Sequence, residues 1–407
     1  MKKNLVLLLF PALLLCGCRE SLPVMETGGQ SMPDAWIDAD TGHKVFKLVK
    51  RDGANHSTYF HNNPFIGEEM IFSGEDAATP GDDMNFAPRT ESAQMYAVNL
   101  RTRKVRRLTD EPFRVRTEIM SAARNEIFYT HEDSVLAVNV GSLERRFVGL
   151  LPKGGGITCV NCDGTLLAGV IGTDKEAEIL RANPQKSSFF NLIWEAHLRK
   201  TIYTMDTVTG QIDSVFSDNE WLNHLQFSPT DPHLLSFCHE GPWHFVDRMW
   251  NIDVVKKNTP VLLHKRTMPM EIAGHEWFGN LGTFEYFDLQ KPKSENFYVG
   301  RVNLETLEEE DFAIRRENWS VHFVTSWDET VLAGDGGDPV KSVAHSPEDQ
   351  WIFLYRFAGD SLKAERLVNM KNHDYKLEPN VHFSPDQKLV IFRANFEGVE
   401  NIYAVEL

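Results

Sequence analysis

Histidine recurs at one position of a strand and turn pattern that repeats along the chain. Three successive copies carry His224, His275 and His322 at this position, and the last copy carries Asn380. With only 15 His in 407 residues, this agreement indicates a shared role. Imidazole takes up protons near neutral pH and binds divalent metals. The column therefore predicts proton transfer, metal binding or both at one place.

Further polar residues extend this column at the two ends of the chain. Glu378 precedes Asn380 by two residues and His382 follows it by two, so all three share one face of an extended strand. His61 lies close to the equivalent position of the first copy, where the alignment needs a small gap. Imidazole, carboxylate and amide donors suit Zn, Mn, Fe or Ni, whereas a closed structural zinc site would favour thiolates. The alternative is a hydrogen-bonded polar channel that holds only water.

A second group of charged residues lies in the segment HEGPWHFVDRMW, which begins at His239. The segment follows the second strand of its copy, so we expect it in a connection outside the histidine column. Ion pairs that hold a loop together are a sufficient explanation for Glu240 and Asp247. Arg248 has apolar neighbours, and its planar fork of donors suits a bidentate contact with a carboxylate. The segment therefore predicts an arginine that binds an acidic ligand.

Seven copies of the strand and turn pattern position these groups. Each copy joins an apolar strand, a turn of the Ser-Pro-Asp type and a second apolar strand, at intervals of about 40 to 65 residues. The copies begin at Tyr59, Arg116, Ile157, His224, His275, Val321 and Glu378. This period is typical of β-propeller blades, so we predict an all-β, seven-bladed β-propeller. Because the innermost strands of a propeller line its channel, the column should lie near one mouth.

Patterns outside the copies complete the predicted ring. Residues 44–50 read KVFKLVK and precede the first full copy, so we expect them to pair with the C-terminal blade and remove an exposed edge. Helical periodicity is almost absent, and residues 187–200 form the one candidate helix. The many aromatic residues are expected to pack between blades.

The N-terminus predicts export. Residues 1–17 combine a short basic region with an apolar run, as in a signal peptide, and the Leu-Cys-Gly-Cys sequence that ends at Cys18 is similar to a bacterial lipoprotein box. An ordinary signal peptide is the alternative. We expect residues 18–40 to form a polar tether and residues 41–407 a single propeller domain. The predicted location is the periplasm or cell surface of a Gram-negative-type bacterium, with membrane contact only through a lipid at Cys18.

Charge and motifs exclude several function classes. Removal of Lys2 and Lys3 would leave 40 of the 42 basic residues against 58 acidic residues, so nucleic acid is not an expected partner. Cys159, Cys162 and Cys238 lack the spacing of a zinc ribbon, and we expect buried thiols or one disulfide between the first two. The chain has no G-x-S-x-G, no phosphate-binding glycine loop and no H-E-x-x-H, and GDGG at 334–337 is interpreted as a strand-end turn.

The chain resembles the oligogalacturonate lyases. These are seven-bladed propellers that cleave short pectin-derived uronides by metal-assisted β-elimination. The resemblance runs from TGHKVFKL to the C-terminus, and it is carried by HEGP with VDRMW, by GHEWF, by VHFVTSWDETVLAGDG and by EPNVHFSPDQ. The Ser-Pro-Asp turns alone would fit any TolB-like propeller.

The resemblance implies roles for the polar residues of the chain. His275, in the GHE segment, would be the general base, and Arg248 would contact the substrate carboxylate. His224 lies in the neighbouring blade in the same register, and it would hold the substrate or protonate the leaving oxygen. His239 and His61 are further candidates for substrate contact. The product would be a 4,5-unsaturated uronide.

The resemblance also implies a metal site. His322 would be one ligand, and the family's Gln-x-x-His-x-His run falls on Tyr375, Glu378 and Asn380, which makes the expected set rich in oxygen donors. The expected cofactor is a divalent metal, with manganese first and calcium, zinc or iron as alternatives. The expected partner is an acidic oligosaccharide. The rival hypotheses are a non-catalytic TolB-like propeller that binds an envelope protein or glycan, and an enzyme acting on a different uronide.

Overall fold

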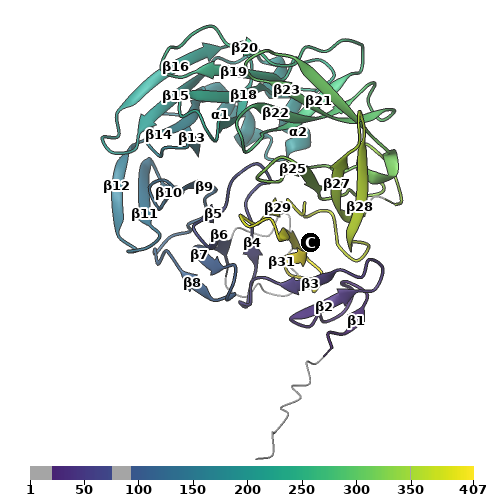
Figure 1. The fold of residues 1–407 in the computed structure, drawn as a ribbon. Coiled ribbons are helices and arrows are strands. Elements are labelled where there is room, and N and C mark those ends of the chain that lie inside the picture. Colours follow the sequence, from purple (N-terminus) through teal and green to yellow (C-terminus); the bar gives the residue numbers. More distant parts are fainter. Residues whose placement is uncertain (1–20, 76–92, 349) are drawn as a thin grey trace, which may run out of the picture.

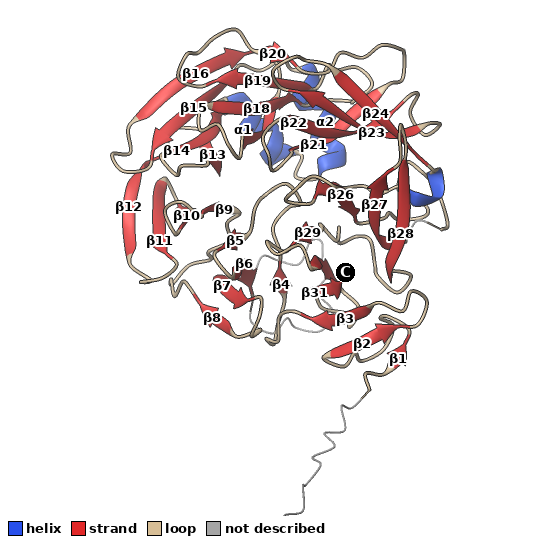
Figure 2. Ribbon diagram, in the orientation of Figure 1, coloured by secondary structure: helices blue, strands red, loops and turns tan. Residues whose placement is uncertain are grey.

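Seven sheets, antiparallel except for one short parallel pair, surround a central axis in the computed structural model, which describes residues 21–75, 93–348 and 350–407. Figure 1 shows the sheets following one another around the ring in chain order, and Figure 2 shows that strands dominate. The protein is therefore a seven-bladed β-propeller, as predicted. The predicted signal peptide and Cys18 lie outside the described residues. Within the described residues, no helix is long and apolar enough to cross a membrane.

The first four blades are built from consecutive strands. Blade 1 contains β4 (Asn55–His56), β5 (Phe65–Ile66), β6 (Glu69–Gly74), β7 (Gln94–Asn99) and β8 (Val105–Arg107). Blade 2 contains β9 (Ile119–Ser121), β10 (Glu126–His131), β11 (Ser134–Asn139) and β12 (Arg145–Leu150). Blade 3 contains β13 (Gly155–Val160), β14 (Leu166–Ile171), β15 (Lys200–Asp206) and β16 (Ile212–Asp218). Blade 4 contains β17 (Leu222–Phe227), β18 (Leu234–His239), β19 (Met249–Asp253) and β20 (Val261–Leu262).

The remaining blades follow the same order and then return to the N-terminus. Blade 5 contains β21 (Ile272–Phe278), β22 (Phe284–Gln290), β23 (Phe297–Asn303) and β24 (Glu309–Ile314). A 3-10 turn, η1 (Arg316–Asn318), leads to blade 6, with β25 (Phe323–Thr325), β26 (Val331–Gly334), β27 (Trp351–Phe357) and β28 (Leu362–Asn369). Blade 7 contains β29 (His382–Phe383), β30 (Leu389–Ala394) and β31 (Asn401–Glu406), to which β3 (Lys44–Lys47), β2 (Ala35–Asp38) and β1 (Val24–Met25) are added.

The ring is closed by pairing between the two ends of the chain. Strand β3 pairs antiparallel with β31, with Val45 opposite Val405. This confirms the closure expected for residues 44–50. Closure of this kind removes the free edges that an open arc of sheets would present.

The polar tether expected over residues 18–40 is wrong for its second part. Strands β1 and β2 extend the seventh blade, and Trp36 is completely buried. The indole Nε1 of Trp36 donates to Thr27 Oγ1 at 2.8 Å, and this hydroxyl donates to Asp38 Oδ2 at 2.6 Å. The polar residues that suggested a tether therefore satisfy one another around a buried tryptophan.

Aromatic side chains pack between neighbouring blades, as expected. The ring of Trp277 in blade 5 stacks on Tyr286 of its own blade at 5.4 Å and on Phe323 of blade 6 at 6.5 Å between centroids. All three side chains are almost completely buried. Burial of each such side chain contributes roughly 1.5–3 kcal/mol.

Two helices interrupt blade 3 between β14 and β15. Helix α2 (Lys186–Glu195) covers most of the helix expected over 187–200, whereas α1 (Asp174–Ala182) was not predicted. Helix α1 has no buried residue, so it lacks the apolar stripe on which a prediction depends. The hydroxyl of Thr173 caps its first turn by accepting from the Glu176 backbone N–H.

Candidate active site

A segment of blade 1, residues 57–63, fills the channel instead of forming an inner strand. The hydroxyl of Thr58 lies 3.3 Å from Nε2 of His382 in blade 7, and the Phe60 N–H donates to Asn380 Oδ1 at 3.0 Å. On the other side, the Tyr59 N–H donates to Glu118, at the start of blade 2, at 3.0 Å. This segment, which we call the plug, therefore joins the two blades that flank blade 1.

The histidine column surrounds the plug. The hydroxyl of Tyr59 lies 3.3 Å from His322 Nε2, and the Tyr59 ring lies 6.5 Å from the ring of His224. The rings of His275 and His322 are 4.6 Å apart, and Phe60 lies within 6.2 Å of His275. The histidines of blades 4, 5 and 6 therefore converge on one end of the plug.

The backbone has the same uncommon conformation at three positions of this column. His224, His275 and Asn380 have φ angles of 47°, 44° and 48°, in the left-handed region that non-glycine residues seldom adopt. The pairing of β17 with β18 shifts register next to His224, and that of β21 with β22 shifts next to His275. A bulge of this kind changes the direction of a side chain. Clusters of such strained residues are typical of functional sites.

Two of the column histidines are backed by an aspartate from the next strand of the same blade. His322 Nδ1 lies 2.7 Å from Asp335 Oδ2, and the Asp335 carboxylate also accepts from the His322 N–H. His275 Nδ1 lies 3.5 Å from Asp288 Oδ2. In both pairs the aspartate comes 13 residues after the histidine. That shared spacing is a signal for both aspartates, but the glycines of GDGG favour the interpretation of Asp335 as part of a turn.

The two histidines differ in exposure. The side chain of His322 is completely buried, whereas that of His275 is 20% exposed. Burial lowers the pKa of His322, but the Asp335 carboxylate more than offsets this, and the net pKa is raised. His275 is therefore the accessible imidazole of the pair.

Arg248 is held by two carboxylates. Its Nε donates to Glu276 Oε2 at 2.9 Å and its Nη1 donates to Glu240 Oε1 at 2.8 Å, while His224 Nε2 lies 3.2 Å from Glu240 Oε2. Although burial raises the pKa of Glu240, the charge of Arg248 and the bond to His224 lower it strongly overall. The ion-pair interpretation of Glu240 is therefore confirmed, and Asp247 likewise pairs with Arg266 at 3.0 Å.

Trp243 joins the arginine to the histidine column. The Arg248 guanidinium lies 4.9 Å from the centre of the Trp243 ring, and the ring of His275 meets the same indole edge-on at 4.9 Å. Gly274 permits this approach, because a Cβ atom there would lie 2.4 Å from the indole. The glycine of GHEWF thus lets the HEGPWHF connection pack directly beside His275.

Two cavities meet at His275. One, of about 450 Å³, is lined by His224, Arg248 and residues of α2 that include Lys186. The other, of about 230 Å³, is lined by Asp288, Asp335, Lys341 and Tyr375 among others. Trp243, His275 and Glu378 line both cavities. The accessible imidazole therefore lies at the centre of this mouth of the channel.

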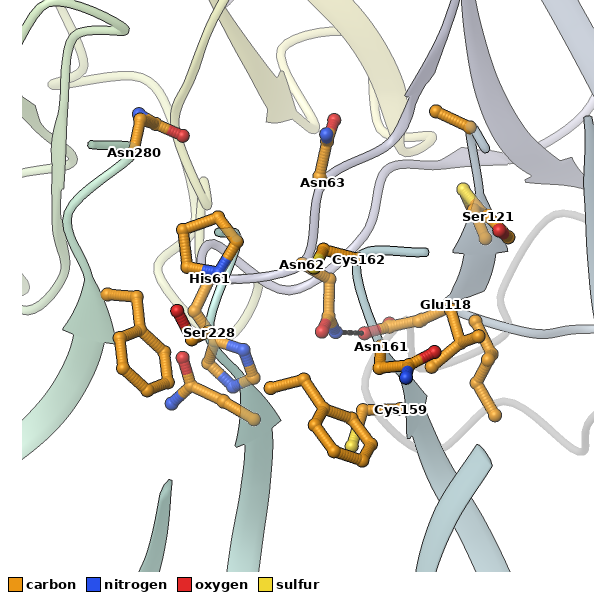
Figure 3. A pocket seen from close by; sticks show the side chains of 18 of the residues that line it. His61, Asn62, Asn63, Glu118, Ser121, Cys159, Asn161, Cys162, Ser228 and Asn280 are labelled. Atoms are coloured by element: carbon orange, nitrogen blue, oxygen red, sulfur yellow. Dashed lines mark hydrogen bonds between the residues drawn. The ribbon is translucent and has the colours of Figure 1, made fainter. Parts of the chain in front are cut away.

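The opposite mouth has a different chemistry. Figure 3 shows its cavity, of about 360 Å³, with side chains of Asn62, Asn161, Cys162, Ser228 and Asn280 around it. Asn62 Nδ2 donates to Glu118 Oε2 at 2.7 Å. Among the described residues that line this cavity there is no Lys or Arg. An anionic ligand is therefore favoured only on the His275 side.

The other predicted residues are distributed unevenly. His61 lies on the plug and faces the opposite cavity, as Figure 3 shows. His239 lies apart, stacked on Trp250 at 4.8 Å between ring centroids, and it lines none of the cavities found among the described residues. Cys159 and Cys162 are free thiols and form no disulfide.

The predicted metal ligands fit a divalent cation in part. Asp335 holds His322 through Nδ1, an arrangement typical of metal-binding histidines, and the remaining Nε2 lies 3.3 Å from the Tyr59 hydroxyl, which a metal would have to displace. Glu378 is exposed, and its carboxylate makes no hydrogen bond or ion pair within the described part of the chain. Asn380 Oδ1 already accepts from Phe60, and the Tyr375 hydroxyl donates to the Asp335 carbonyl at 3.3 Å. His322 and Glu378 are thus the better candidates.

A second group of donor atoms was not predicted as a metal site. Among the described residues, His224, Cys238 and Glu240 offer donor atoms that all lie within 4.8 Å of one another. Arg248 donates to Glu240 from 2.8 Å. A guanidinium so close would repel a metal cation at this position.

Comparison with known proteins identifies the family. A model of the sequences of one protein family, described as oligogalacturonate lyase, matches residues 31–407 of the chain. The chain is 25% identical over 395 residues to an oligogalacturonide lyase of Pectobacterium atrosepticum, covering 91% of this chain and 95% of that protein. It is also 25% identical over 398 residues to an oligogalacturonate lyase of Dickeya dadantii, with the same shares covered.

Solved structures support the fold. An oligogalacturonate lyase in complex with manganese superposes with a TM-score of 0.75 at 22% identity, covering 94% of this chain and 98% of the other. An oligogalacturonate lyase from Vibrio parahaemolyticus gives a TM-score of 0.74 at 22% identity, with the same coverage. The chain therefore belongs to the oligogalacturonate lyase family and is an enzyme of the carbon–oxygen lyase class.

Proposed function

We propose that the enzyme cleaves short galacturonate oligosaccharides by β-elimination at the mouth of the channel that contains His275. The observation that carries this proposal is the position of His275, an accessible imidazole at the junction of two cavities with Asp288 behind it. The names of the curated relatives support the substrate class. We further propose that the enzyme acts outside the cytoplasm, as its N-terminal sequence suggests.

Proton removal is the first chemical requirement. The proton on C5 of a uronide is weakly acidic, so a base near neutral pKa must be held close to it. His275 takes this proton through Nε2, because Nδ1 faces Asp288. The C5–H electron pair forms the C4–C5 double bond as the C4–O bond breaks, and the 4-O-linked sugar leaves. His224, 33% exposed beside Glu240, is placed to donate a proton to the leaving oxygen.

Charge neutralisation is the second requirement. Removal of the C5 proton places negative charge on the adjacent carboxylate, so cationic groups in a site that excludes water lower the barrier. Arg248 is fixed by two carboxylates and by Trp243, and it contributes a directed N–H donor. Arg248 contributes more to the orientation of the substrate carboxylate than to the net positive charge of the site, because Glu240 and Glu276 already balance its charge.

A divalent cation is the remaining part of the proposal. His322 and Glu378 would hold it, with Asn380 and Tyr375 as further oxygen donors, and manganese is the first choice because a solved oligogalacturonate lyase is a manganese complex. When bound, such an ion supplies Lewis-acid neutralisation of the substrate carboxylate.

The test is an absorbance assay for the unsaturated uronide product. Wild-type enzyme incubated with digalacturonate and manganese should produce this absorbance. His275→Gln should lower kcat by roughly 10²–10⁴, the usual contribution of a general base. His233→Gln, in the turn between β17 and β18 at the other end of blade 4, is the matched control and should retain full activity. Wild-type enzyme that releases no unsaturated product from any uronide would refute the proposal.

A further inference from the structure

We propose that Arg116, supported by Arg114, forms a second carboxylate-binding subsite on the same mouth, so that the enzyme selects galacturonate chains longer than the dimer. This inference rests on the proposed function and names a specificity determinant for it. The cavity that carries it is lined by neither His275 nor Arg248.

This cavity is the largest at the mouth, at about 680 Å³. It lies between the plug, at His61 and Asn62, and blades 2 to 4, and its lining includes Arg114, Arg116, Thr117, Tyr129, Thr130 and Asn223. His61, Asn62 and Glu118 also line the cavity of Figure 3, whereas the two arginines line only this one. His224 lines both this cavity and the one that holds Arg248 and His275. An extended ligand at His275 would therefore continue past His224 into this space.

The two arginines differ in how far their charge is satisfied. Arg114 Nη1 lies 3.1 Å from Glu75 Oε1, and its side chain is 21% exposed. Arg116 is exposed and forms no hydrogen bond or ion pair within the described part of the chain. Its charge acts on Glu400 and His56 through longer-range electrostatics, without a hydrogen bond. Arg116 thus offers a free guanidinium fork to the cavity.

The carboxylate nearest in sequence does not compete for this arginine. Glu118 also lines the cavity, but its Oε2 accepts from the Tyr59 N–H at 3.0 Å and from Asn62 Nδ2 at 2.7 Å. These bonds hold Glu118 against the plug. A ligand carboxylate would therefore be the favoured partner of Arg116.

The charge of the whole protein strengthens this inference. A formal net charge of −16 repels anions at long range, so a polyanionic substrate needs local cationic positions along its path. Every galacturonate unit carries one carboxylate, and a guanidinium can bind it through two parallel hydrogen bonds. One carboxylate meets Arg248 near His275, and a unit further along the same chain meets Arg116.

The test compares substrate lengths. The KM of Arg116→Gln should rise roughly tenfold for tetragalacturonate, the cost of one charge-assisted contact, while the KM for digalacturonate and both kcat values stay unchanged. For tetragalacturonate, the KM of Arg116→Lys should lie between those of the wild type and Arg116→Gln, because lysine keeps the positive charge but lacks the two parallel donors of a guanidinium. Arg101→Gln is the matched control, since Arg101 is an exposed arginine near Glu68, 3.6 Å away, in the turn between β7 and β8. Equal changes in KM for both substrates, or no change for either, would overturn the subsite.

A binding experiment separates the subsite from the proposed function. If wild-type enzyme cleaves no galacturonate, the proposed function fails, and calorimetric titration with tetragalacturonate then tests the subsite alone. Weaker binding by Arg116→Gln than by Arg101→Gln supports the subsite. Equal binding by the two variants, or no binding by the wild type, refutes it.

Discussion

Replacement of Glu285 by Gln should make the protein more stable than the wild type, by a margin that grows as the pH rises. Glu285 lies in β22 and is completely buried, and Ser236 Oγ donates to its Oε1 at 2.6 Å. Its Oε2 has no hydrogen-bond partner among the described residues. Burial, with a smaller contribution from the nearby Glu276 carboxylate, raises the pKa of Glu285 to about 8.

The sign and size of the effect follow from linkage. Between the ordinary pKa of 4.5 and the folded value of about 8, the folded protein keeps a proton on Glu285 that the unfolded chain has lost. The free energy of unfolding therefore falls with pH across this window. By pH 7 the loss is ~3 kcal/mol, since one pKa unit corresponds to ~1.4 kcal/mol. Glutamine cannot ionise, so Glu285→Gln escapes this loss.

Denaturant unfolding at pH 4.5, 5.5, 7 and 8 measures the difference in stability between the two proteins. The stability of Glu285→Gln minus that of the wild type should grow by about 3 kcal/mol from pH 4.5 to pH 7. Glu305→Gln removes an exposed carboxylate and should show no such trend. The contributions of the other titrating groups to the pH dependence cancel in this difference, because these groups are common to both proteins. A difference that does not change with pH would show that Glu285 is ionised in the folded protein and would refute the reasoning.

Two further predictions concern the ions of the site. Arg248→Met should lower the free energy of unfolding by about 3–5 kcal/mol, because Glu240 and Glu276 would stay buried without their partner; a loss below about 1 kcal/mol would contradict the buried network. His322→Ala and Glu378→Ala should each lower the manganese retained per protein in elemental analysis, whereas His233→Gln should leave it unchanged. Full retention by both alanine variants would show that His322 and Glu378 do not hold the metal.

The blades could be predicted from the sequence because they repeat. Each copy contributes the same turn and the same alternation of apolar residues, so seven weak signals reinforce one another. The same redundancy placed His224, His275, His322 and Asn380 in one register. The closing strand β3 was also predictable, because a strand without a partner at one end of the chain implies a free edge at the other.

Features without a repeat were missed or misjudged. Helix α1 has no buried face, and residues 21–40 seemed too polar to fold until Trp36 was seen to be buried. Asp288 and Asp335 do repeat, but they were overlooked because Asp335 lies among glycines that suggest a turn. Arg248 stands out in the sequence because its neighbours are apolar, yet its partner Glu276 lies in another blade, and no sequence pattern joins the two.

Of the features that could not be predicted from the sequence, the plug has the largest effect on the site. YFHNNPF contains strand-forming aromatic residues, so it was aligned as an inner strand, and the small gap at His61 was the only sign of a departure. Asn62, Asn63 and Pro64 favour turns, which is consistent with a segment that leaves the sheet. The plug reaches the rings of His224 and His322, so it forms part of the wall beside the histidine column. Among the described residues, no Lys or Arg lines the cavity of Figure 3, so the cationic residues that favour an acidic chain lie on the His275 side.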